Sequence, residues 1–578
     1  MRKLALVSSF FILVTLLPLS ALGTTTPDEH WNIPRATLDG QLGVGFDDRQ
    51  GFSFVGALRA LVMKNGVPTG PICKSLNDPA CVGAEYFSLG ATLSPCKEST
   101  QVNCVESLTA RKQDGTTERA TFVGYVSDDE SLYWKGDEAK FIPDSKVESI
   151  WNFPSLTHPG GKDFLLNPIL GGSYAPEQLP KWTHFVTMLQ PVSRIIDSQM
   201  ERPRAMGNER LDFMSPEAIA GKNPWTGGQR GSHAKNCATS VDGACYRREP
   251  FPEGVSFSVA IRTNSQVGGW IHGRMKSPEV SINQSGNAWV VTVGGLPTEI
   301  PVVSEWFDNE NDKKTILSAY ASAAPTTWGV GSSGTAQFYT NSTYDSTAIN
   351  RLNVVRPYIK DKASANPKIW AFGSIDPVRL ASDAAALGGK GYCVLKAPGL
   401  AGIVMTNATV YDGSIPAYSE KDQTLNYLVS APHYAANGTE FVGTYDLVIR
   451  ADIARCIYGF NKTPTSATVS IVRGDTVEKV STTTLTEKDG WLSLAAYGFT
   501  FSTPKISVKL NRAPEEIPVT TAAVASATQE STNAAARTAV KPAPKKAVVK
   551  SIYCAKANAR KLVKGNNPKC PKGYKLVK

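Results

Sequence analysis

The sequence of 578 residues is poor in the short motifs that accompany catalysis or metal binding. It contains no G-x-S-x-G nucleophile elbow, no H-E-x-x-H zinc motif and no G-x-x-x-x-G-K phosphate-binding loop. Histidine is scarce: the six residues lie far apart along the chain and form no cluster of metal ligands in the sequence. No two cysteines have the C-x-x-C spacing of metal sites and redox motifs. We therefore expect no metal site, no cofactor and no catalytic residue that a motif would reveal.

Long apolar runs are also lacking after the first twenty residues. Arg2 and Lys3 precede a mostly apolar, uncharged run from Leu4 to Leu17, and small residues stand at the −3 and −1 positions of a cut after Gly23. This run is shorter than the roughly 20 residues that span a bilayer, so it predicts a cleaved secretory signal peptide at residues 1–23. The sequence also lacks a sortase-type LPxTG signal. We expect a secreted, extracellular protein with no transmembrane segment after cleavage.

The ten cysteines, an even number, suit an oxidising compartment. Three cysteine pairs enclose seven residues each, and the enclosed segments are polar and carry turn residues. The first four cysteines could pair in three ways. Because all three cysteine pairs have the same spacing, we expect each pair to form a local disulfide. Cys393 and Cys456 remain as a long-range pair in the body. A strand-like segment at 445–454 precedes Cys456, so we expect this disulfide to tie two strands together, as inter-sheet disulfides do. The expected bonds are Cys73–Cys81, Cys96–Cys104, Cys237–Cys245, Cys393–Cys456 and, in the tail, Cys554–Cys570.

Acidic residues are absent from the end of the chain. Residues 537–578 contain thirteen Lys or Arg and no Asp or Glu, whereas the net charge of the whole chain is +10, so the remainder sums to −3. A solvated, disordered basic end is one interpretation. Two cysteines and a Gly-Asn-Asn-Pro turn within the segment favour a small hairpin held by its disulfide. The cations that we expect to bind an anion are Lys556, Arg560, Lys561, Lys564, Lys569, Lys572 and Lys575.

Short alternating segments broken by turn dipeptides dominate the body. One example is a hairpin that joins residues 104–111 to 119–126, and another joins 279–282 to 288–293. Amphipathic helical spacing is rare. We predict a mainly β protein with two or three β-sandwich-like domains and few short helices, then a flexible linker and a disulfide-closed basic module. The predicted divisions are a signal peptide at 1–23, β-rich regions at 24–250 and 251–350, a sandwich-like domain at 351–511, an Ala/Thr/Pro/Lys linker at 512–550 and the basic module at 551–578.

The tail carries a resemblance to known proteins. Cys554 is followed after fifteen residues by Cys570, Pro571, Gly573 and Tyr574 in the order Cys-Pro-Lys-Gly-Tyr-Lys. This pattern resembles the C-terminal segment of large, uncharacterised secreted proteins of actinobacteria, and the stretches TYDLVIRADIARCIYGF and EKDGWLSLAAYGFTF resemble segments of the same proteins. The resemblance covers about residues 350–578. It implies a cell-surface context in a Gram-positive-type cell and assigns no catalytic residue.

These observations predict a secreted, non-catalytic surface protein associated with the cell envelope, which serves adhesion, ligand capture or envelope structure. Lysine attracts an anion as a point charge without reading its shape, so the expected partner of the tail is an anionic wall polymer or another polyanion, not a specific nucleic acid. The alternative is a secreted hydrolase of polysaccharides with the same tail, whose catalytic carboxylates would come from separated strands.

Overall fold

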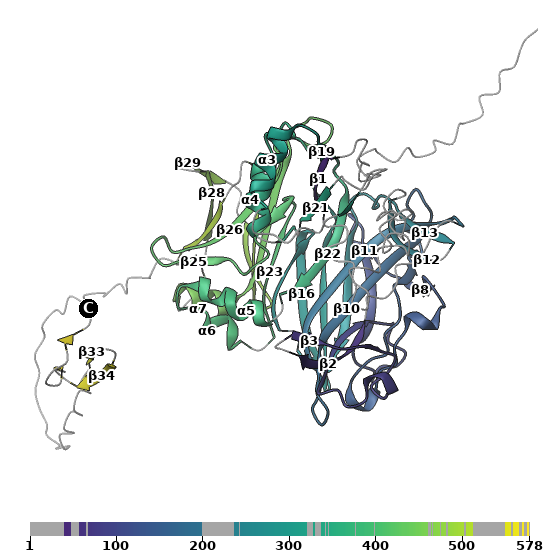
Figure 1. Cartoon of the computed structure of the whole chain (residues 1–578), viewed down its shortest axis with the longest axis horizontal. Coiled ribbons are helices and arrows are strands. Elements are labelled where there is room, and N and C mark those ends of the chain that lie inside the picture. The colour runs from purple at the N-terminus through teal and green to yellow at the C-terminus, as the bar shows by residue number, and fades with distance from the viewer. Residues whose placement is uncertain are drawn as a thin grey trace, which may run out of the picture. The chain divides into compact units, whose positions relative to one another are not determined.

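The structure is a computed structural model with two compact units, residues 1–515 and 516–578. Helices and strands are labelled as in Figure 1. The signal peptide expected at 1–23 and nearly all of the expected linker, up to residue 549, lie outside the described residues. The described residues are 40–47, 57–64, 67–198, 236–241, 243–266, 268–320, 328–329, 337–341, 343–344, 346–375, 377–397, 399–460, 464, 466–473, 476–480, 484–501, 505–511, 550–556, 559–565, 569–570 and 575–576.

The first unit is mainly β, as the alternating sequence pattern predicts, and is built on one long sheet (Figure 1). Neighbouring strands pair in the order β30-β31-β27-β23-β15-β22-β11-β10-β5-β2. All of these pairs are antiparallel except β15 with β23. The strands along this path are β2 (Leu58–Lys64), β5 (Tyr86–Thr92), β10 (Asp163–Tyr174), β11 (Lys181–Ile196), β15 (Gly269–Arg274), β22 (Lys368–Ser374), β23 (Leu400–Thr406), β27 (Val442–Arg450), β30 (Thr484–Lys488) and β31 (Trp491–Thr500).

Short strands extend this long sheet at its sides. β9 joins β8 to β10, and β13 joins β12 to β11. The added strands are β3 (Val67–Thr69), β4 (Ile72–Cys73), β8 (Thr121–Tyr125), β9 (Ser149–Asn152), β12 (Cys237–Val241), β13 (Ala244–Arg248) and β18 (Thr298–Glu299).

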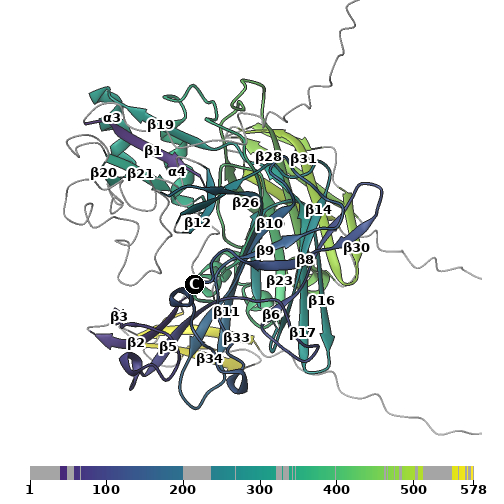
Figure 2. The ribbon, with the colours of Figure 1, turned by 90° about the vertical axis from the view of Figure 1, so that its right-hand side faces the viewer.

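A second sheet packs against one half of the long sheet (Figure 2). Its order is β16-β17-β14-β6-β7. Large apolar side chains from both sheets meet between them, among them Phe164, Leu189 and Trp370 from the long sheet and Phe257 and Val293 from the second sheet. Two facing sheets with a common apolar core are the arrangement of a sandwich. The strands of the second sheet are β6 (Cys104–Arg111), β7 (Thr117–Arg119), β14 (Ser256–Thr263), β16 (Lys276–Ser285) and β17 (Ala288–Leu296).

The two hairpins predicted in this region have different outcomes. β16 and β17 form the predicted hairpin, with Ser285 opposite Ala288 at the turn. In the other hairpin, β6 pairs with β7 only from Thr109 to Arg111, because the chain then continues into β8, which pairs with β9 of the long sheet instead.

A third sheet, of order β24-β26-β32-β28-β29 with β25 beside β26, packs against the other half of the long sheet. Tyr427 and Val508 of the third sheet share a buried core with Tyr445 and Leu494 of the long sheet. The long sheet therefore supplies one layer to each of two sandwich-like cores. The strands of the third sheet are β24 (Val410–Tyr411), β25 (Ala417–Ser419), β26 (Thr424–Ser430), β28 (Ser466–Arg473), β29 (Thr476–Val480) and β32 (Lys505–Asn511).

A smaller fourth sheet packs against helices α3 and α4 around Phe46, Ile316 and Leu352. Asn309 begins α3, because its side-chain oxygen accepts hydrogen bonds from the backbone N–H groups of Asn311 and Asp312. The elements are β19 (Val303–Phe307), β1 (Leu42–Phe46), β21 (Gln337–Asn341), β20 (Trp328–Gly329), α3 (Glu310–Ser318) and α4 (Ser346–Val355).

Three further helices lie together beside the third sheet (Figure 1). The disulfide Cys393–Cys456 forms between two of them, so the expectation that it ties two strands is wrong. β27 ends at Arg450, and the buried residues that follow, Ile453, Ala454 and Ile457, have helical spacing. The helices are α5 (Pro377–Asp383), α6 (Tyr392–Leu395) and α7 (Ala451–Tyr458), and the 3-10 helices of the unit are η1 (Pro79–Cys81), η2 (Glu130–Leu132), η3 (Glu138–Lys140) and η4 (Ala384–Leu387).

The three short loops that the cysteine spacing predicts are closed by disulfides. Cys73–Cys81, Cys96–Cys104 and Cys237–Cys245 each join residues eight positions apart. Within the described ranges, no helix combines the length and the apolar character that crossing a bilayer requires.

The second unit contains a small antiparallel sheet of order β34-β33-β35. β33 (Lys550–Lys556) and β34 (Ala559–Gly565) form a hairpin, and β35 (Lys575–Leu576) pairs with the other edge of β33. The predicted turn at 565–568 falls almost wholly outside the described residues.

Candidate functional site

The cations that the sequence singles out are carried by the three strands of the tail. Lys556 ends β33, three of the cations lie on β34, and Lys575 begins β35. Lys569 lies between β34 and β35 and is exposed, and Lys572 lies outside the described residues. The three cations of β34 are Arg560, Lys561 and Lys564.

The strand register brings together cations that are far apart in the sequence. Ala555 of β33 lies opposite Arg560 on one side and Lys575 on the other. Neighbouring strands are about 4.8 Å apart, so the backbones of Arg560 and Lys575 are separated by roughly 10 Å although fifteen positions separate them in the chain. A single sheet therefore collects positive charge that the sequence distributes over twenty residues, from Lys556 to Lys575.

The disulfide expected in the tail is described only in part. Cys570 is disulfide-bonded. Cys554 lies on β33, opposite Lys561 and Leu576, but its side chain is outside the described part of the structure. The Cys554–Cys570 bond stays a prediction.

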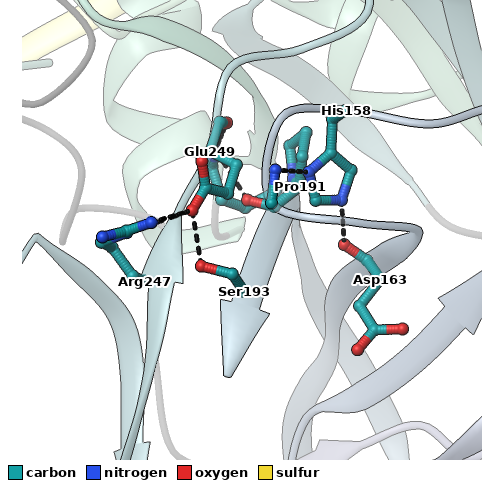
Figure 3. A network of polar contacts seen from close by, with 8 residues as sticks. His158, Asp163, Pro191, Ser193, Arg247 and Glu249 are labelled. Carbon is teal, nitrogen blue, oxygen red and sulfur yellow. Dashed lines mark hydrogen bonds and ion pairs between the residues drawn. The ribbon is translucent and has the colours of Figure 1, made fainter. Parts of the chain in front are cut away.

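A polar network joins three segments of the first unit, and Figure 3 shows it from close by. The Glu249 carboxylate is almost fully buried and accepts a hydrogen bond from the Ser193 hydroxyl at 2.5 Å. The same oxygen forms an ion pair with Arg247 at 2.8 Å. Gly160 allows this approach, since a Cβ at that position would lie 2.5 Å from Cγ of Glu249. The hydroxyl of Ser193 is thus bound to a carboxylate that already forms an ion pair with Arg247.

His158 belongs to the same region, yet both of its ring nitrogens are bound to backbone (Figure 3). Nδ1 accepts a hydrogen bond from the Gly160 N–H at 3.2 Å, so the proton of the neutral ring is on Nε2, which donates to the Asp163 carbonyl at 2.9 Å. Burial lowers the pKa of His158, although the Asp163 carbonyl and the Glu249 charge oppose this change. The Glu249 contacts therefore crosslink β11 to the residues at the end of β13, whereas the His158 ring braces only the loop before β10. Because both nitrogens of His158 are bound to backbone and not to Ser193, the three residues do not form a Ser-His-Glu catalytic arrangement.

A buried carboxyl group with an unusual pKa lies where β27, β31 and the start of β16 meet. The Tyr497 hydroxyl donates to Oδ1 of Asp446 at 2.6 Å, and the Ser277 N–H donates to Oδ2 at 3.4 Å. Ser277 Oγ lies 3.1 Å from the Tyr497 hydroxyl, and Lys276 Nζ lies 4.6 Å from the centre of the Tyr497 ring. Burial raises the pKa of Asp446 to about 7, although the two hydrogen bonds and the Lys276 charge oppose the rise.

The sequence could not have revealed this cluster. Asp446 lies 51 residues from Tyr497 and 169 residues from Ser277 along the chain. Asp446 and Tyr497 lie in the two body stretches that resemble segments of secreted actinobacterial proteins, but no catalytic motif surrounds either of them, and only the pairing of β27 with β31 brings the aspartate near the tyrosine.

The described residues contain no group of three or more His, Cys, Asp or Glu side chains arranged to hold a metal ion. No model of a known protein family matches this chain, and no curated protein is significantly similar to it. The function has to be argued from the chain's own residues.

Proposed function

We propose that this chain is a secreted, non-catalytic surface protein, and that residues 537–578 retain it on anionic polymers of the cell envelope. The observation that carries the proposal is the segregation of charge: thirteen cations without one acidic residue in the tail, against a net negative remainder. The body then serves adhesion, ligand capture or envelope structure, at the place where the tail holds it.

The strand arrangement of the tail supports a surface that binds by charge. Arg560 and Lys575 flank Ala555 across the sheet, and Lys561 and Lys564 lie on the same edge strand as Arg560. A flexible anionic polymer would contact several of these cations at once and release its counterions. Such binding tolerates variation in the polymer and weakens steeply with salt.

The resemblance of the tail to segments of secreted actinobacterial proteins favours a wall polymer as the partner. The disulfides of the body suit an oxidising compartment, in keeping with an extracellular position. Outside a Gram-positive-type cell, phosphate-bearing and acidic wall polymers would provide dense negative charge.

The experiment compares residues 24–578 with residues 24–536 in sedimentation with isolated Gram-positive cell walls. We expect the longer chain to sediment with the walls at low ionic strength and to be released as NaCl rises, whereas the truncated chain stays in solution. Equal sedimentation of both chains would refute the proposal.

Matched variants distinguish charge from fold. Changing Lys556, Lys561, Lys564 and Lys575 to Gln should lower the NaCl concentration that releases the protein, whereas changing the same four residues to Arg should not, because charge is kept. If the Arg variant is released as easily as the Gln variant, binding depends on the lysine side chains themselves and the charge argument fails.

A further inference from the structure

We propose that a hollow beside the Cys96–Cys104 disulfide is a binding site for a neutral saccharide. The hollow has a volume of about 320 Å³, within the range of small-molecule sites, and lies in a part of the chain that is described without a gap from residue 67 to 198. It is distinct from the basic tail, so this inference does not depend on the proposed mode of retention.

One wall of the hollow is the disulfide loop that precedes β6. Arg262 of β14 holds this loop from behind, because its guanidinium donates to the carbonyl oxygens of Glu98 at 2.9 Å and Gln101 at 3.2 Å. The same guanidinium forms an ion pair with Glu106. The disulfide and three charge-assisted contacts thus fix the wall in the absence of a ligand.

The opposite wall is the segment from η3 to β9. Asn103, which is buried, connects the two walls by donating from Nδ2 to the carbonyl oxygen of Phe141 at 2.6 Å. In the same segment, Asp144 accepts a hydrogen bond from the Gly136 N–H at 2.9 Å, and Ser145 accepts one from the Thr92 N–H at 3.0 Å. Both walls are therefore preorganised, which reduces the entropy lost when a ligand binds.

The lining offers the groups that sugars need. Phe141 is 40% exposed at the rim and provides an apolar ring for the C–H face of a pyranose. Glu98 and Glu138 also line the hollow, and both are exposed. Their side chains make no hydrogen bond or ion pair within the described residues, so their carboxylates can accept hydrogen bonds from hydroxyl groups. Thr100 and Lys97 add donors.

The charges of the lining favour a neutral ligand over an ion. Lys97 and Lys146 offset most of the charge of Glu98, Glu138 and Asp144. Lys146 itself lies over the rings of Tyr125 and Tyr133, at 4.6 Å and 5.2 Å from their centres, and these contacts hold its charge beside the hollow. A polyhydroxylated neutral molecule uses both the free carboxylates and the exposed ring, whereas a small cation would use the carboxylates alone.

The test uses the full secreted chain, residues 24–578, in 0.5 M NaCl, which suppresses binding by the tail. Cellotetraose, mannotetraose, chitotetraose and a wider array of neutral bacterial oligosaccharides are screened, and positive compounds are titrated by calorimetry. We expect at least one to bind, and binding to weaken tenfold or more in the double variant Glu98→Gln with Glu138→Gln.

A second variant, Phe141→Asn, removes the ring but retains a residue type that tolerates the left-handed backbone found there (φ 58°). It should also weaken binding tenfold or more. The matched control changes two exposed glutamates away from the hollow, Glu85→Gln with Glu420→Gln, and should bind as the parent does.

Three results would overturn the proposal. One is that no neutral oligosaccharide binds the parent chain. Another is that binding is unchanged in both pocket variants while their thermal unfolding matches that of the parent. The third is that spermine binds in a Glu98- and Glu138-dependent manner while no saccharide binds, which would make the hollow a cation site.

Discussion

At the scale of single residues, Asp446 gives the sharpest prediction about stability. Burial raises the pKa of its carboxyl group from 3.8 in the unfolded chain to about 7 in the folded protein. Between these values the folded state binds more protons than the unfolded state, so the free energy of unfolding falls as pH rises through this window. A shift of this size corresponds to a loss of roughly 4 kcal/mol, complete above pH 7 and absent below pH 4.

Asp446→Asn should remove this pH dependence, because an amide can still accept the hydrogen bond from Tyr497 but cannot ionise. The measurement is urea unfolding of both proteins between pH 4 and pH 8. The parent should lose stability relative to the variant as pH increases. The control is Asp128→Asn at an exposed position, which should leave the slope unchanged. A parent whose stability relative to Asp446→Asn is constant over this range would contradict the assigned burial effect.

At this scale, the sequence predicts contacts between residues that are close together in the chain better than contacts between residues that are far apart. The three local disulfides could be predicted because eight-residue spacing alone brings their cysteines within reach. Asp446 and the saccharide hollow could not, because their groups come from strands and loops that only the folded sheets bring together. Arg262, for example, supports a loop more than 160 positions earlier.

At the scale of elements, helix α7 shows why a strand was predicted in the wrong place. The expected strand at 445–454 ran four residues past the true end of β27 at Arg450. Both faces of β27 are buried, so its buried residues do not alternate with exposed ones, and α7 follows it directly. The sequence pattern therefore does not mark the end of the strand. The missed signal was Gly459, which ends the helix in a left-handed conformation (φ 69°).

Gly459→Ala should destabilise the protein by about 1 kcal/mol, because glycine adopts the left-handed backbone freely whereas alanine adopts it only at an energetic cost. The cost is conformational, since a Cβ at this position would meet no atom within 4 Å. Gly459→Asn should cost less, because asparagine tolerates this conformation better. Chemical unfolding of the two variants beside the parent measures the difference. Equal costs for Ala and Asn would argue against a left-handed helix end.

The disulfide that joins α6 to α7 should matter more than the short ones. Removing Cys393–Cys456 by double substitution to Ala frees a loop of 63 residues, for which chain entropy predicts a loss of about 4 kcal/mol. Removing Cys73–Cys81 in the same way frees a loop of 8 and should cost about 2.5 kcal/mol. Free energies of unfolding from denaturant titrations test the ranking, and a larger loss from the short loop would reverse it.

At the scale of the whole molecule, charge is the property that the sequence predicts best, because it does not depend on folding. Residues 24–578 should bind a cation-exchange resin at pH 7 and low salt, whereas residues 24–536, whose formal charge is negative, should pass through. The NaCl concentration at elution measures the effect. Retention of the truncated chain would mean that the body has a basic surface of its own.

The fold class could also be predicted, because alternating apolar and polar residues indicate a strand whichever strand it pairs with. The connection between the two sandwich-like cores could not. β15 pairs with β22 on one side and with β23 on the other, although β22 and β23 follow it by about one hundred residues or more. No local pattern specifies which strands will be neighbours across such a separation.

The long sheet has a consequence for how the body unfolds. Because its strands form a layer of both cores, loosening either sandwich exposes apolar surface in the other. The body should therefore melt in one cooperative step, without a half-unfolded state that proteases could cut.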